Sequence, residues 1–303
     1  MNTICHICGS EVNGVYDTDE LYAYFVKQCP NCGELRVPIE NRDFFDATEY
    51  LPRCYSQNDC YMVNVTDFCT NSCRDCYNRG GKHRDIRDIM DEVYRYPMGS
   101  RILVSGGEPL ERPNIEFVVE CIASGGYKPV LLTNGGLLSE DMYSRLTGSG
   151  LSHEHLPQIS VSLGIPGTNR SFDSAYDNVA RQKVQIIAFS INCVEEVLEV
   201  ERIAESLRGQ YGEVCIRTSW DGRNNNVFLG DIDHILHGER LSSPTLYGHR
   251  SVQIMKNGIR YSLLSWSGIT CFDRNRYANR GVWYKGKNVV ETLIDEITVQ
   301  KLS

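Results

Sequence analysis

The chain has 303 residues, of which 41% are hydrophobic, and it carries a formal net charge of −8. This length fits one large domain with one or two small additions. The acidic balance argues against broad phosphate-driven binding of nucleic acid, which needs clustered Lys and Arg, and leaves a local basic patch open. No apolar run has the length of a membrane span, and the start lacks signal-peptide features, so we expect a soluble, cytoplasmic protein.

Two C-x2-C-G motifs near the start supply Cys5, Cys8, Cys29 and Cys32. Each motif can form a tight knuckle, and two knuckles surround one tetrahedral ion with four thiolates. The strand-like residues 21–27 between them complete the pattern of a zinc ribbon, with rubredoxin-type iron as the alternative metal. Such a closed site predicts a structural metal that folds a segment too small for its own core.

The ribbon and a linker are predicted to fill residues 1–50. Polar residues and the helix breakers Pro38 and Pro52 indicate a linker over residues 34–59. At its end lie Cys54 and Cys60, which are interpreted as ordinary buried or surface thiols, with a cluster-ligand role as the alternative.

A third group of cysteines follows the strand-like residues 61–68. Cys69, Cys73 and Cys76 have C-x3-C-x2-C spacing, which allows three thiolates to hold three irons of a cubane cluster. Clusters that only carry electrons normally have four cysteine ligands, so this loop predicts an iron left open for a small molecule. A structural zinc or cluster site is the alternative.

The turn Gly106, Gly107 and Glu108 follows another short apolar run, residues 101–104. In this order, the cysteine loop and the turn resemble the radical S-adenosylmethionine (SAM) superfamily over residues 60–220. The resemblance implies one [4Fe-4S] cluster on the three cysteines, SAM chelating the open iron, and the turn contacting the methionine amino group. Relatives usually carry an aromatic or large apolar residue before the third cysteine; here it is Asp75, and Tyr77 is the candidate for the adenine contact.

From residue 61 the chain alternates between strand-like and helix-like segments. The expected strands are residues 61–68, 101–104, 129–135, 158–164, 184–192 and 213–220, and the expected helices are residues 85–94, 114–122, 139–146, 171–181 and 194–207. Six strands separated by helices predict an α/β fold with a parallel sheet and right-handed crossovers. The resemblance makes this a partial (β/α)6 TIM-like barrel, placed at residues 51–225.

In parallel barrels, functional side chains gather where the strands end. The candidates for SAM binding at these ends, besides the turn, are Thr133, Asn134, Ser162, Asn192 and Arg217. By resemblance, the last three would contact the SAM ribose, carboxylate and adenine. Each has an equal interpretation as a strand-end capping or salt-bridging residue, and the Asn-Gly after Thr133 is also a common turn.

Residues 226–303 leave the alternating pattern and predict an α+β extension, rich in strands, that covers the barrel. We expect a short helix at residues 231–237, a hairpin at residues 252–264 around an Asn-Gly turn, and a second strand pair at residues 282–290. Only Cys271 lies in this extension among the six cysteines left over, so no auxiliary cluster is expected. The six are Cys54, Cys60, Cys121, Cys193, Cys215 and Cys271, and most are interpreted as buried thiols.

These features predict a radical SAM enzyme. By resemblance, it cleaves SAM reductively to a 5'-deoxyadenosyl radical, which abstracts hydrogen from a C–H bond of a peptide, a natural-product intermediate or a lipid. A flavodoxin- or ferredoxin-type protein is the expected electron donor. The alternatives are an activase that installs a glycyl radical on a partner protein, and a non-catalytic zinc and iron-sulfur scaffold or sensor.

Overall fold

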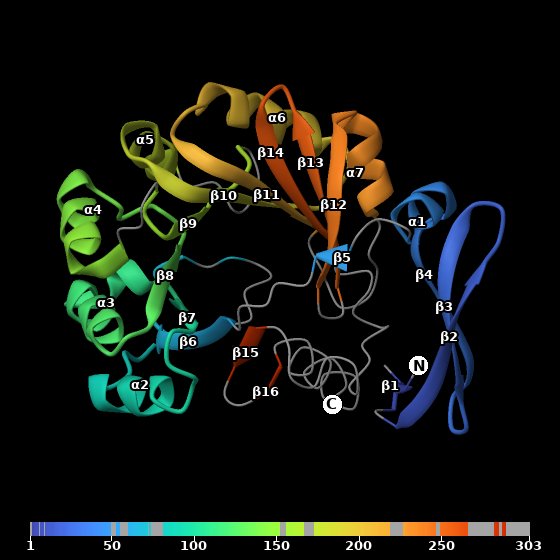
Figure 1. Cartoon of the computed structure of the whole chain (residues 1–303), viewed down its shortest axis with the longest axis horizontal. Coiled ribbons are helices and arrows are strands. Elements are labelled where there is room, and N and C mark those ends of the chain that lie inside the picture. The colour runs from blue at the N-terminus through green and yellow to red at the C-terminus, as the bar shows by residue number, and fades with distance from the viewer. Residues whose placement is uncertain are drawn as a thin grey trace.

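The computed structural model describes residues 2–5, 7–8, 10–49, 53–54, 60–71, 73, 81–151, 156–166, 173–218, 227–246, 249–265, 282–284 and 287–288. Two sheets organise this part of the chain, a four-stranded one at the N-terminus and a twelve-stranded one that bends into an arc (Figure 1). Among the described helices, none has the length and apolar character needed to span a membrane.

The N-terminal sheet is antiparallel with the strands in chain order. Its strands are β1 (Asn2–Ile4), β2 (Glu11–Thr18), β3 (Tyr22–Cys29) and β4 (Gly33–Asn41). Alternate residues of β3 are buried, so one face of the strand packs in a small core made by Ala23, Phe25, Ile39 and Phe45. The strand expected over residues 21–27 is thus confirmed.

The linker expected from residue 34 onward is wrong over residues 34–49. There β4 continues to Asn41, and α1 (Arg42–Glu49) follows directly and contributes Phe45 to the small core. Pro38 is compatible with β4 because this is the edge strand of its sheet, and the pairing register shifts beside it. The polar residues that suggested a linker instead form the end of a strand and the start of a helix.

Six parallel strands follow, each hydrogen-bonded to the next in chain order. They are β6 (Cys60–Thr66), β7 (Arg101–Gly106), β8 (Lys128–Thr133), β9 (Ile159–Ser162), β10 (Val184–Ile191) and β11 (Tyr211–Thr218). The connecting helices are α2 (Ile86–Val93), α3 (Ile115–Ser124), α4 (Glu140–Leu146), α5 (Asp173–Arg181) and α6 (Glu196–Ser206). They lie on the outer, convex side of the arc (Figure 1). The predicted α/β class with a partial (β/α)6 barrel is confirmed.

The main hydrophobic core lies between these strands and helices. Fully buried residues such as Val63, Ile102 and Phe189 alternate along their strands with residues that face the inside of the arc. Ser139 caps α4 as its position in the sequence predicts, because its hydroxyl accepts from the Met142 N–H. Burial of the helix-facing side leaves the inner side free to carry polar groups.

Strands from outside the barrel extend both of its edges. Beyond β11 lie β14 (Ile259–Ser265), β13 (His249–Lys256), β12 (Glu239–Leu246) and β5 (Arg53–Cys54). Beyond β6 lie β15 (Val282–Tyr284) and β16 (Lys287–Asn288). Both β14 and β15 run parallel to their barrel neighbours, which lengthens the arc without reversing it.

Both expected strand pairs of the C-terminal extension are confirmed, and among its described residues the strand β12 was missed. In the hairpin, Asn257 and Gly258 have φ angles of 52° and 76°, as a type I′ turn requires. The expected short helix is α7 (Leu229–Leu236). The polar segment that forms β12, interrupted by Pro244, gave no strand signal; it pairs with β13 through a register shift between Arg240 and Ser242.

A buried carboxylate joins the N-terminal sheet to the rest of the molecule. Glu40, near the end of β4, is fully buried and accepts hydrogen bonds from the N–H groups of Leu229 and Gly230 at 3.2 and 3.1 Å. These groups belong to the first turn of α7, where the helix dipole favours a negative charge. Beside it, Asn41 Nδ2 donates to Asp231 at 2.7 Å. The N-terminal segment is therefore fixed to the chain that leaves the last barrel strand.

We expect Glu40→Ala to lower the free energy of unfolding by about 1–3 kcal/mol, because two buried N–H groups lose their acceptor. Urea denaturation followed by circular dichroism measures this loss. Glu20→Ala is the matched control, since Glu20 is an exposed carboxylate in a turn of the same segment. Equal stability of the two variants would show that the carboxylate does not hold α7.

Candidate functional site

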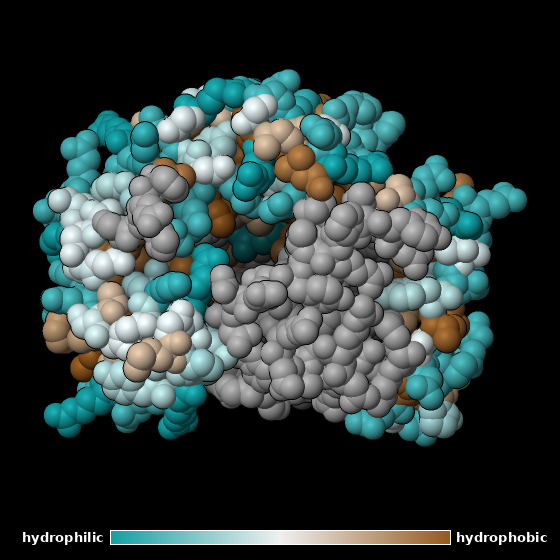
Figure 2. Space-filling model, in the orientation of Figure 1, coloured by the Kyte–Doolittle hydropathy of each residue, from teal (hydrophilic) through white to brown (hydrophobic). Residues whose placement is uncertain are grey.

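The predicted site residues lie where the barrel strands end. Gly106, Gly107 and Glu108 end β7 and begin the next loop, and Thr133 is the last residue of β8. Ser162 ends β9, and Arg217 lies one residue before the end of β11. Cys69 and Cys73 follow β6, whereas Cys76 and Tyr77 lie outside the described residues. The face drawn in Figure 2 is hollowed inside the arc of strands, with hydrophilic residues at the bottom of the hollow.

The chain enters and leaves the cysteine loop at one place. The Asp67 N–H donates to Lys82 O at 2.8 Å, and the Arg84 N–H donates to Val65 O at 3.2 Å. The hydroxyl of Thr66 is 2.8 Å from His83 Nδ1. Because these contacts close the loop at its base, the cysteines between residues 68 and 81 belong to a segment with fixed ends.

The glycine turn packs directly against the entrance of this loop. The Gly107 N–H donates to Thr66 O at 2.7 Å, and the Glu108 N–H donates to Phe68 O at 2.9 Å. A Cβ atom on Gly106 would lie 2.0 Å from Thr66 O, and one on Gly107 would lie 2.2 Å from Phe68 O. Gly106 also has a φ of 130°, which L side chains rarely adopt. Both glycines are therefore required by the close approach of two backbones.

Glu108 extends this contact to the next strand. Its side chain is 2% exposed, and its carboxylate accepts from the Leu110 N–H at 3.0 Å, the Thr133 hydroxyl at 2.6 Å and the Asn134 N–H at 2.8 Å. Burial raises the pKa of the Glu108 carboxyl, although these hydrogen bonds act in the opposite direction. The structure thus brings together three of the predicted residues, Glu108, Thr133 and Asn134. A carboxylate with two oxygens has about four acceptor positions, so roughly one remains for a ligand.

Arg217 and Ser162 also meet, across the inner side of the arc. Arg217 Nη2 donates to Ser162 Oγ at 3.2 Å, while Arg217 Nε is buried and makes no hydrogen bond within the described part of the chain. Asn192 stands apart from this pair: it is exposed, and its backbone N–H donates to Glu196 at 2.6 Å. The structure therefore joins two of the three residues expected at the last strands.

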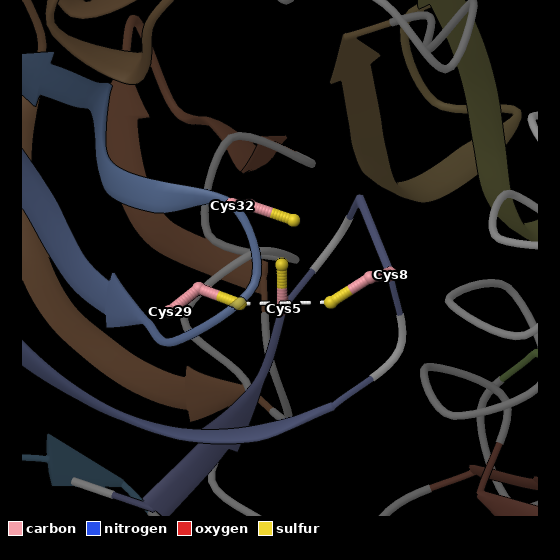
Figure 3. Close-up of side chains that lie close together, drawn as sticks. All are labelled: Cys5, Cys8, Cys29 and Cys32. Carbon is pink, nitrogen blue, oxygen red and sulfur yellow. Dashed lines mark hydrogen bonds between the residues drawn. The ribbon is translucent and has the colours of Figure 1, made fainter.

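The four cysteines of the N-terminal sheet converge on a common point (Figure 3). Their sulfurs all lie within 4.8 Å of one another, and Cys8 Sγ is 3.5 Å from Cys29 Sγ. A tetrahedral zinc with Zn–S bonds of about 2.3 Å needs sulfurs about 3.8 Å apart, so the group fits a metal after a small contraction. Hydrogen bonding to Ser10 lowers the pKa of Cys8 to about 6, and burial raises the pKa of Cys32 to about 12.

The cysteine loop also fits the group that its spacing predicts. Cys69 and Cys73 are both partly buried, and burial is the main cause of the raised pKa of the Cys69 thiol. Soft thiolates in a loop with a fixed base suit an iron-sulfur cluster. Of the other cysteines, Cys60, Cys121 and Cys215 are partly buried; Cys193 is exposed, which corrects its expected burial. The side chains of Cys54 and Cys271 lie outside the described residues.

Comparisons with known proteins agree with this arrangement. Residues 63–200 match the family model of the Radical SAM superfamily. A probable GTP 3',8-cyclase of Methanothermobacter marburgensis is 33% identical over 130 residues, which cover 41% of this chain and 41% of the relative. The AdoMet-dependent heme synthase of Methanosarcina barkeri is 26% identical over 174 residues, 50% of this chain and 47% of the relative. The chain thus spans less than half the length of these two relatives.

Solved structures give weaker likenesses. Streptococcus suis SuiB bound to S-adenosylmethionine has a TM-score of 0.45 and 12% identity, covering 64% of this chain and 49% of that chain. Archaeal TYW1 has a TM-score of 0.35 and 14% identity, covering 63% of this chain and 75% of that chain. The family assignment rests on the sequence match. The part of this chain from residue 63 to residue 200, which contains the cysteine loop and the glycine turn, therefore belongs to the radical SAM superfamily.

Proposed function

We propose that this chain is a radical SAM enzyme whose [4Fe-4S] cluster is held by Cys69, Cys73 and Cys76. Family membership implies both the cluster and SAM. The observation that carries the proposal is the cysteine loop with its closed base, packed against a glycine turn that admits no side chain. When bound, the cluster and SAM supply an electron and a 5'-deoxyadenosyl radical that abstracts hydrogen from a substrate C–H bond.

The residues at the strand ends would bind and orient SAM. The remaining acceptor position of Glu108, together with the backbone of Gly106 and Gly107, suits the ammonium group, because a charge-assisted hydrogen bond is stronger than a neutral one. Arg217, with a buried nitrogen that lacks a hydrogen bond within the described residues and with Ser162 beside it, suits the carboxylate. The nucleoside part would contact the other predicted residues, Tyr77, Asn134 and Asn192, while Thr133 would act through Glu108, to which its hydroxyl donates.

The C-terminal extension would exclude water from the radical. Its strands β14 and β15 lengthen the barrel at both edges. The sheet therefore encloses more of the hollow inside the arc than six strands alone could enclose. A flavodoxin- or ferredoxin-type protein would supply the electron. The named relatives are a GTP cyclase and a heme synthase, and each match covers half of this chain or less. Because these relatives have different activities, their likeness to this chain supports radical generation, while the substrate is proposed to be a peptide, a natural-product intermediate or a lipid.

Anaerobically reconstituted protein should convert SAM to 5'-deoxyadenosine and methionine when reduced with dithionite. Cys73→Ala should abolish this conversion, because a cluster with one fewer thiolate is not held. Liquid chromatography of the products measures it, with Cys121→Ala on α3 as the control. Undiminished 5'-deoxyadenosine from Cys73→Ala would refute the cluster assignment, and none from the wild type would favour the non-catalytic scaffold.

We further propose that Cys5, Cys8, Cys29 and Cys32 hold a structural zinc, with iron as the alternative metal. Cys29→Ser should release this metal and lower the melting temperature, because a four-thiolate site contributes directly to folding of its segment. Metal analysis and calorimetry measure both effects, with Cys121→Ser as the control. A folded variant should still cleave SAM; selective loss of cleavage would show that the site does more than fold its segment.

A further inference from the structure

A second carboxylate, not singled out by any sequence motif, contacts the cysteine loop. Glu111 ends the short 3-10 helix Pro109–Glu111 that follows the glycine turn. Its carboxylate accepts from the Thr70 N–H at 2.9 and 3.0 Å and from the Thr70 hydroxyl at 2.6 Å. Thr70 is the residue immediately after Cys69, so these bonds fix the backbone beside the first proposed cluster ligand.

The same short helix thus directs two carboxylates to different places. Glu108, at its start, is buried and bonds to the end of β8, whereas Glu111, at its end, is partly exposed and bonds to the cysteine loop. Together with the backbone bonds from Gly107 and Glu108, the contact with Thr70 continues the attachment of the loop beyond Phe68. The attachment therefore reaches past Cys69 rather than ending before it.

We propose that Glu111 is a positioning residue for the cluster, holding Cys69 in place through Thr70 and setting a negative charge beside it. This inference rests on the proposed function, because it concerns the cluster that the loop is proposed to bind. Glu111 needs no contact with the cluster: it acts through the backbone N–H and the hydroxyl of its neighbour.

The charge of Glu111 gives the proposal a second consequence. The carboxylate of Glu111 accepts hydrogen bonds from the N–H and the hydroxyl of Thr70, so its negative charge lies beside the residue that follows Cys69. A negative charge near a cluster ligand disfavours adding an electron, so Glu111 should make the reduction potential of the cluster more negative. The two effects of Glu111, its contact with the loop and its negative charge, can therefore be tested by different substitutions.

Iron retention tests the geometry. Reconstituted wild type, Glu111→Ala and Thr70→Val are mixed with an iron chelator, and the rate of iron loss is followed by absorbance. Both variants should lose iron faster, Glu111→Ala by about tenfold, which corresponds to about 1.4 kcal/mol. Glu120→Gln, which removes an exposed carboxylate on α3, is the control. If Glu111→Ala does not fold when metal-free, Thr70→Val still tests the contact; rates equal to the control would overturn the proposal.

The reduction potential tests the charge and separates it from a purely structural role. In an EPR-monitored redox titration, Glu111→Gln should shift the potential to a less negative value, because it keeps an acceptor for Thr70 but removes the charge. Thr70→Val and Glu120→Gln should leave the potential unchanged. An unshifted potential in Glu111→Gln would overturn the proposal. If wild-type protein takes up no cluster at the three cysteines, the proposed function itself fails. Failure of the Glu111 proposal alone looks different, because the wild type then still holds its cluster.

Discussion

Hydrogen bonds between two backbones, at the entrance of the cysteine loop, are the constraint on which the proposed site depends. The N–H groups of Gly107 and Glu108 reach the carbonyls of Thr66 and Phe68 only because neither Gly106 nor Gly107 has a side chain. The Glu108 carboxylate then carries the contact to β8, so the ends of three consecutive strands form one unit. This unit, rather than separate loops, would therefore fix the position of bound SAM relative to the cluster.

The remaining parts of the chain support this unit from outside. The core between strands and helices fixes the strand ends, while β14 and β15 extend the arc at its two edges. On the N-terminal side, Glu40 ties the four-cysteine sheet to α7, which follows the last barrel strand. The N-terminal segment is thus connected to the side of the barrel that holds Arg217. The two residues that make this connection, Glu40 and Leu229, are 189 positions apart in the sequence.

Local patterns in the sequence predicted most elements, because strand alternation, the Ser139 cap and the Asn257-Gly258 turn need only neighbouring residues. They failed where the signal depends on distant partners: Glu40 looked like part of a polar linker until α7 supplied the N–H groups it accepts from. The missed β12 has the same cause, since its polar residues pair only because β13 lies beside them. Within the proposed site, the spacing pointed to the cysteines and Glu108 as candidates, but neither the near saturation of the Glu108 carboxylate nor the contact of Glu111 with Thr70 follows from spacing.

The central claim is that the three-cysteine loop leaves one iron open for SAM. The most direct measurement is EPR spectroscopy of the dithionite-reduced, reconstituted protein with and without SAM. The account predicts the signal of a single [4Fe-4S]+ cluster that changes when SAM is added, because SAM becomes a ligand of the open iron. A spectrum that SAM leaves unchanged, or a protein that binds no cluster at residues 69, 73 and 76, would contradict it.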